Sequence, residues 1–149
     1  MDKRADRTVA LMSIHPVYAK RLLDGSKCVE FRKTRLSSDI RYVVIYATAP
    51  IKRVVGYFSV KQIVIDTPTE IWFQYRRVAG IGQSEFHEYY EGSMQAVAIE
   101  VAQMHVLSRP KPISVMADNT RPPQSYQYFG NKVIKTLSRY KTVKRISAA

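Results

Sequence analysis

The sequence predicts an α+β domain in which one small, strongly curved mixed sheet or open barrel is flanked by short helices. Segments rich in Val, Ile and Tyr recur along the chain, and tight turns or short helical stretches separate them. A parallel, doubly wound sheet would need longer helices between its strands. The 149 residues are 46% hydrophobic, which suffices for one buried core without disulfides. We therefore expect residues 1–149 to form a single domain with about five to six strands.

The first half of the chain begins with a strand over residues 8–14 and continues into a short helix. Pro16 suits the first turn of this helix, and Gly25 can adopt the left-handed conformation that ends it. Residues 41–48 and 53–65 are rich in Val, Ile and Tyr and are separated by a turn. These two segments are expected to pair as a hairpin.

Residues 27–33 form another predicted strand, in which apolar and polar side chains alternate. Val29 and Phe31 point to one face, which we expect to be buried. The opposite face carries the polar side chains of Cys28, Glu30 and Arg32. This pattern predicts a charged face on one strand of the sheet.

The second half of the chain contains three short helices and one long strand. Residues 67–70 read Thr-Pro-Thr-Glu, a helix start with a threonine cap, a proline in the first turn and a glutamate three residues after the cap. A second helix is expected from residue 84 to residue 92, and a long strand over residues 94–107. Apolar residues at helical spacing between 133 and 140 predict the last helix.

The chain carries a large excess of positive charge, with 24 Lys and Arg against 12 Asp and Glu, a net charge of +12. Such a charge attracts polyanions, so nucleic acid is the expected partner, although it could also serve only solubility. From residue 103 onward, nine basic residues accompany the single acid Asp118. We expect residues 141–149 to form a mobile basic tail. The acidic helix over residues 84–91 offers a surface for a protein partner.

Several classes of protein are disfavoured by the composition. Cys28 is the single cysteine, so no intrachain disulfide forms, and the three histidines lie far apart in sequence. We expect neither a metal site nor a cofactor. The longest apolar run, residues 42–47, is far shorter than the roughly 18 residues that cross a bilayer. With no apolar signal segment after Met1, we expect a cytoplasmic protein that does not bind membranes.

The run from Leu11 to Lys33 resembles the opening of the ASCH domain, a branch of the PUA-like superfamily. Its key pattern is Gly25-x-Lys27-x-x-Glu30-x-Arg32. The likeness continues through further ordered motifs at residues 45–56, 67–72, 96–99 and 122–126. The resemblance covers roughly residues 9 to 129 and is more specific than any one motif. It implies a PUA-like β-barrel with a cleft between barrel and helices, and RNA or modified nucleotides as ligands.

Five residues are predicted to bind nucleic acid. Lys27 and Arg32 can hold phosphates or base edges, and Glu30 between them stays ionised and orients the ligand. The alternative is that Glu30 and Arg32 form a structural ion pair that closes the mouth of the barrel. Arg121 and Tyr126 belong to a basic and aromatic cluster, of the kind that stacks unpaired bases.

Tyr46, Lys52 and Ser125 form the catalytic set that we expect if the protein is a ribonuclease acting on single-stranded RNA. Tyr46 and Lys52 end a strand and enter the following turn, and the resemblance brings Ser125 to the same cleft. A lysine neutralises the scissile phosphate, a phenol passes a proton and a hydroxyl positions the phosphate, while the RNA 2′-hydroxyl is the nucleophile. In the alternative interpretation Tyr46 packs, Lys52 decorates a hairpin and Ser125 caps a turn.

Two other functions stay open. One is a non-catalytic regulator that binds a nucleotide or nucleic acid, DNA included. The other is an amidohydrolase acting on acylated or modified nucleosides, since some relatives of this fold use a Thr-Lys-acid trio. Lys27 matches the lysine, but Glu30 stands where the threonine is expected. Where the acid is wanted the chain has Tyr75, Arg76 and Arg77.

Overall fold

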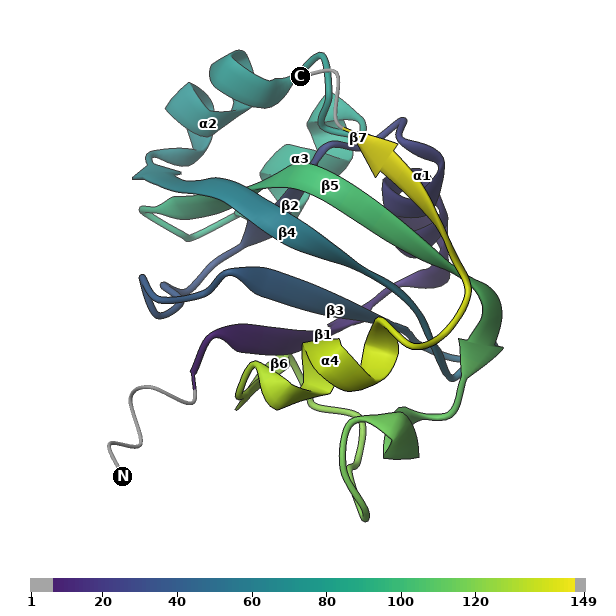
Figure 1. The fold of residues 1–149 in the computed structure, drawn as a ribbon. Helices are drawn as coiled ribbons and strands as arrows, with labels where there is room; N and C mark the ends of the chain where they lie inside the picture. Colours follow the sequence, from purple (N-terminus) through teal and green to yellow (C-terminus); the bar gives the residue numbers. More distant parts are fainter. Residues whose placement is uncertain (1–6, 147–149) are drawn as a thin grey trace.

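The computed structural model describes residues 7–146 and shows one curled sheet of seven strands with short helices around it (Figure 1). The strands are β1 (Val9–Ile14), β2 (Val29–Arg32), β3 (Tyr42–Ala47), β4 (Arg53–Asp66), β5 (Ala96–Lys111), β6 (Tyr126–Phe129) and β7 (Thr142–Ile146). The helices are α1 (Pro16–Asp24), α2 (Pro68–Tyr75), α3 (Gln83–Tyr89) and α4 (Lys132–Leu137), and a 3₁₀ turn spans Ile113–Val115. This arrangement confirms the predicted α+β class.

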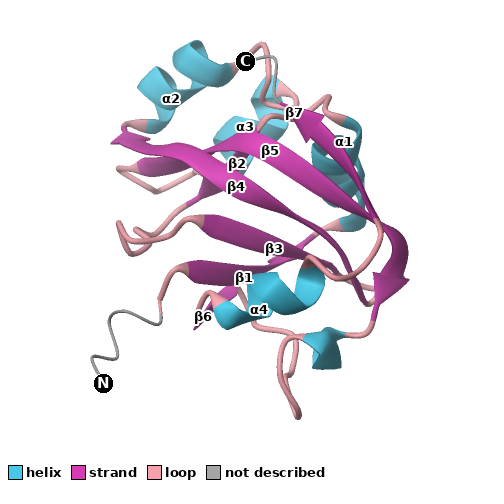
Figure 2. Ribbon diagram, in the orientation of Figure 1, coloured by secondary structure: helices cyan, strands magenta, loops and turns pink. Residues whose placement is uncertain are grey.

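The strands follow the order β2-β5-β4-β3-β1-β6, and β7 pairs with β5. The β1–β3 pair is parallel, whereas every other pair is antiparallel. The predicted hairpin is confirmed as β3 and β4. β5 is the longest strand, and both β2 and β7 pair with it, β2 through residues 97–100 and β7 through residues 103–107. The sheet is therefore mixed and strongly curved (Figure 2).

Three clusters of buried side chains hold the layers together. The first fills the inside of the curled sheet, where alternate residues of β1 and β3 meet Ala19 and Leu22 of α1. The second lies on the other face of β1 and β3, under Val133, Ile134 and Leu137 of α4. The third packs β2 and the start of β5 against α2 and α3. Each predicted helix therefore covers a sheet face with its apolar stripe.

Local signals in the sequence set the helix ends as expected. Gly25 ends α1 with a φ of 85°, a conformation that residues with a Cβ rarely adopt. At the start of α2, the Thr67 side chain accepts a hydrogen bond of 3.2 Å from the Glu70 backbone amide. These caps satisfy backbone groups that the helix itself leaves unpaired.

The end of the chain differs from its predicted form. We expected a mobile tail from residue 141, but Thr142–Ile146 form β7 along the edge of β5. The backbone amide of Ser108 also donates to the Lys141 carbonyl at 2.9 Å. An edge strand offers unpaired backbone groups that a following segment can satisfy whatever its charge. The remainder of the predicted tail, residues 147–149, lies outside the described residues.

Candidate functional site

The charged face of β2 is buried, which the alternation of its residues did not reveal. Val29 and Phe31 pack against α2 and α3, so the side chains of Glu30 and Arg32 point to the inside of the curled sheet. The exposed fractions are 3% for Lys27, 7% for Glu30 and 9% for Arg32. Ionised groups are rarely buried to this extent unless they are paired or bind something.

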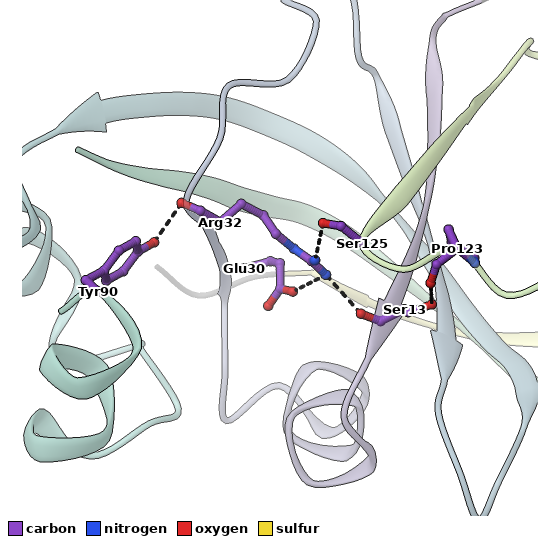
Figure 3. A network of polar contacts seen from close by, with 6 residues as sticks. All are labelled: Ser13, Glu30, Arg32, Tyr90, Pro123 and Ser125. Atoms are coloured by element: carbon purple, nitrogen blue, oxygen red, sulfur yellow. Dashed lines mark hydrogen bonds and ion pairs between the residues drawn. The ribbon is translucent and has the colours of Figure 1, made fainter. Parts of the chain in front are cut away.

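Arg32 joins three segments that are far apart in sequence (Figure 3). Its Nη2 donates to Glu30 Oε2 at 3.0 Å and to the Ser13 carbonyl at 3.1 Å, and its Nη1 donates to Ser125 Oγ at 3.2 Å. The Tyr90 hydroxyl donates to the Arg32 carbonyl at 2.9 Å. Arg32 therefore ties β2 to β1 and to the chain just before β6. Its Nε is buried and has no partner among the described residues.

Lys27 lies before β2 and has a nearly buried ammonium group. Its Nζ donates to the Ala79 carbonyl at 2.7 Å and lies 4.6 Å from the centre of the Phe31 ring. Burial lowers the pKa of Lys27 to about 8, although the nearby Glu30 acts in the opposite direction. Gly80, with a φ of 61°, passes so close to Lys27 that a Cβ at this position would overlap its side chain. The segment after α2 thus fixes the lysine in place.

These residues border a cavity of about 220 Å³, which we call the β2 hollow. Besides Lys27, Glu30 and Arg32, its lining includes the aromatic side chains of Tyr18, Phe31, Phe86 and Tyr89. Ser13 and Ile14 at the end of β1, together with His15 and Ile81, complete the lining. The Tyr18 hydroxyl donates to Glu85 Oε2 at 2.7 Å and thereby links α1 to α3. Burial, with help from Glu85, raises the pKa of Tyr18 to about 12. The hollow thus brings two cations, one carboxylate and four aromatic rings around one small cavity.

Of the predicted catalytic residues, Ser125 reaches this site directly. Ser13 lies between Ser125 and Tyr46, because it pairs with Tyr46 in the sheet and its amide donates to the Ser125 carbonyl at 3.2 Å. Tyr46 is only 5% exposed and packs in the second cluster, under α4. Lys52 is exposed in the turn after β3 and has a φ of 51°. Among the described residues, Ser125 is hydrogen-bonded directly to Arg32, whereas Tyr46 and Lys52 are not.

Arg121 and Tyr126 lie outside the lining of the β2 hollow. Arg121 is exposed in the loop that precedes β6. Tyr126 begins β6 and packs against the first cluster, and its ring centre lies 5.3 Å from that of Tyr128. The face of Tyr126 is therefore used in packing.

Sequence reasoning missed several residues of the site. Ser13 interrupts the apolar run of the first strand, and such a polar residue at a strand end is a signal for a site. Tyr18 and Tyr89 carried no comparable signal, because helical spacing alone does not say which aromatic residue borders a cavity. Among residues 7–146, no group of three His, Cys, Asp or Glu is placed to hold a metal ion. No helix in this range is long and apolar enough to span a bilayer.

Comparison with known proteins identifies the family. The chain matches the ASCH domain over residues 12–107. The ASCH domain-containing ribonuclease of Zymomonas mobilis is 33% identical over 136 residues, which cover 89% of this chain and 91% of that protein. The large ribosomal subunit protein uL22 of Ureaplasma parvum is 32% identical over 128 residues, 85% of this chain but 41% of that protein.

A solved structure agrees with the sequence relatives. The crystal structure of ASCH from Zymomonas mobilis has a TM-score of 0.79 at 29% identity, and the match covers 93% of this chain and 98% of that one. The chain therefore belongs to the ASCH domain family. The resemblance and the PUA-like fold predicted from the sequence are both confirmed.

Proposed function

We propose that the protein binds single-stranded RNA in the β2 hollow and cleaves it beside Ser125. The observation that carries this proposal is the pair of buried cations, Lys27 and Arg32, held beside aromatic rings in one cavity. Unpaired bases stack on aromatic side chains, and phosphates bind lysine and arginine.

Two other observations support an RNA substrate. The net charge of +12 favours a polyanion over a neutral ligand. The Zymomonas mobilis relative, which is similar over most of both chains, is named a ribonuclease. DNA is the other nucleic acid to test as a ligand. Glu88 and Glu91 in the acidic segment 84–91 are exposed and offer a surface for a protein partner. Glu85 of that segment already accepts a hydrogen bond from Tyr18.

The proposed reaction uses the RNA itself as nucleophile. The 2′-oxygen attacks the neighbouring phosphorus as the 2′-hydroxyl loses its proton to solvent, and the 5′-oxygen leaves. The products are a 2′,3′-cyclic phosphate and a 5′-hydroxyl end. Ser125 positions a phosphate oxygen and Lys52 neutralises the charge that builds on the phosphate. The leaving 5′-oxygen takes its proton from solvent, because Tyr46, the predicted donor, packs on the other face of the sheet.

The test is incubation of the purified protein with end-labelled single-stranded RNA and with DNA of the same sequence, each with and without EDTA. We expect cleavage of RNA alone, with cyclic phosphate at the new 3′ ends. Lys52→Ala should abolish cleavage, whereas Lys20→Ala, which removes another exposed lysine, should not. Equal cleavage by both variants would show that Lys52 has no catalytic role.

A non-catalytic RNA-binding regulator is the second candidate, and the burial of Tyr46 is the observation that favours it. A tyrosine that is 5% exposed and packed under α4 has little access to a scissile phosphate. A gel shift with RNA in the absence of cleavage would support this candidate. Neither shift nor cleavage would direct attention to small modified nucleosides, the substrates of the amidohydrolase alternative.

A further inference from the structure

We propose that a second site, separate from the β2 hollow, binds the phosphate backbone of RNA. This site, the β5–β7 hollow, is a cavity of about 260 Å³ lined by Ser108, Arg109, Lys111, Tyr140 and Lys141. Its lining residues belong to the end of β5 and to the chain that runs from α4 into β7, two segments that Figure 1 shows. The inference rests on the proposed function, since it takes RNA to be the ligand.

The lining of the β5–β7 hollow carries three cations and no carboxylate. Arg109 and Lys111 lie at the end of β5, where its register against β4 shifts, and both side chains line the hollow. The backbone bond from Ser108 to the Lys141 carbonyl brings the third cation beside them. The Lys111 ammonium lies 4.5 Å from the centre of the Tyr140 ring, which holds it at the hollow.

No side chain neutralises these cations within the part of the chain that the structure describes. Arg109, Lys111 and Lys141 form no ion pair there. Their mutual repulsion is relieved when an anion enters between them. Phosphate oxygens accept hydrogen bonds from lysine, arginine and the Ser108 hydroxyl alike. The chemistry of the hollow therefore fits a phosphate group.

The size and surroundings of the hollow favour a polymer over a small molecule. Its volume is below the roughly 300–1,000 Å³ of sites that enclose a whole small ligand. The chain on either side continues with exposed cations, Lys135 and Arg139 before the hollow and Lys144 after it. Exposed cations on neighbouring segments attract a phosphate backbone without reading bases. The aromatic rings that could stack bases line the β2 hollow instead, and the two hollows share no lining residue.

The experiment measures binding without cleavage. The probe is a fluorescent 2′-O-methyl oligouridylate of roughly 20 nucleotides, whose blocked 2′-oxygen cannot attack the phosphate, titrated between about 0.05 and 0.2 M salt. The test variant is Arg109→Gln with Lys141→Gln, both exposed. The matched control is Lys20→Gln with Arg77→Gln, which removes one lysine and one exposed arginine elsewhere. Thermal unfolding checks that each variant keeps its fold.

We expect the test variant to make the slope of log K against log salt less steep by about 1.4, since each phosphate contact to a single strand contributes about 0.7. Its affinity at about 0.1 M salt should fall roughly 25-fold, and the control should lose much less. An unchanged test variant, or an equal loss in the control, would overturn the inference while leaving the proposed function intact. A wild-type protein that binds vesicles of anionic lipid but not RNA would overturn both.

Discussion

Replacing Lys27 by methionine separates the cost of a buried charge from its use in binding. Methionine is unbranched and close to lysine in shape, so it should keep the packing against Phe31 and Gly80. Burial that lowers the pKa of Lys27 from 10.5 to about 8 disfavours the charged form by about 3 kcal/mol. The substitution removes this cost but leaves the Ala79 carbonyl without its donor, at about 1–3 kcal/mol.

The two effects nearly cancel, so the Lys27→Met variant should be as stable as the wild type at pH 7, within about 2 kcal/mol. Its affinity for RNA should fall at least tenfold, because a buried cation of the β2 hollow is lost. The assays are urea unfolding and fluorescence anisotropy with the 2′-O-methyl oligouridylate. Lys20→Met, at an exposed position, is the control for loss of one charge.

The pH dependence of the free energy of unfolding tests the lowered pKa of Lys27 directly. Between pH 8 and 10.5 the unfolded chain binds the Lys27 proton and the folded chain does not, so the free energy of unfolding rises with pH. From pH 7 to 9 the gain is about 1 kcal/mol, or roughly 2–4 °C in Tm. His105, whose pKa is lowered from 6.5, titrates below this window. The pKa of Tyr90 is raised from 10.0 by burial, so Tyr90 lowers the free energy of unfolding only as the pH approaches 10, where the unfolded chain loses its proton, and the comparison therefore stops at pH 9.

In the Lys27→Met variant the rise should be absent, and the affinity of the wild type for RNA should fall between pH 7 and 9 as Lys27 loses its charge. A wild-type Tm that stays flat over this range would refute the reasoning about Lys27. So would a methionine variant that is destabilised by more than about 3 kcal/mol, because the ammonium would then be a structural group whose hydrogen bond outweighs its burial cost.

Three further substitutions test the rest of the site. Arg32→Ala should lower the free energy of unfolding by about 3–5 kcal/mol, measured with urea, because Glu30 stays buried without a partner. Arg32→Met combined with Glu30→Gln should recover most of this loss, and a double variant without recovery would contradict the ion pair. Ser125→Ala should slow RNA cleavage roughly 10- to 100-fold with Tm unchanged, and full activity would remove Ser125 from the site. Gly80→Ala should cost about 1–3 kcal/mol and weaken RNA binding, since a Cβ there displaces Lys27; unchanged binding would show that the lysine can move freely.

The elements that the sequence predicted well are those whose signals are local. Gly25 and Thr67 mark helix ends through the conformation or hydrogen bond of a single residue. The β3–β4 hairpin joins neighbours in sequence. By contrast, β6 and β7 form only because β1 and β5 present free edges from distant parts of the chain. Their aromatic and β-branched residues favour strands, but β6 has only four residues and β7 only five, so pairing across the fold decides their structure.

The site was predicted in part for the same reason. Alternation along β2 showed that Glu30 and Arg32 share a face, and the resemblance pointed to Lys27 and Ser125. The alternation did not show that this face lies inside the sheet. The burial of the face depends on the curl of the sheet, which brings β2 toward β1 and the chain before β6. Tyr18 and Tyr89 enter the β2 hollow through helices whose orientation follows from packing in the clusters around them.

The two cationic hollows differ in how their charges are held, and this difference bears on what each can do. In the β2 hollow, Arg32 is fixed by three partners and Lys27 is held by the Ala79 carbonyl and adjoining rings, so both cations keep one geometry. Fixed donors select a ligand by shape, at a cost in stability. Arg109 and Lys141 are exposed and have no ion-pair partner among residues 7–146, so their attraction for a phosphate weakens steeply as salt rises. A substrate drawn in by exposed charge and aligned by buried charge would use both.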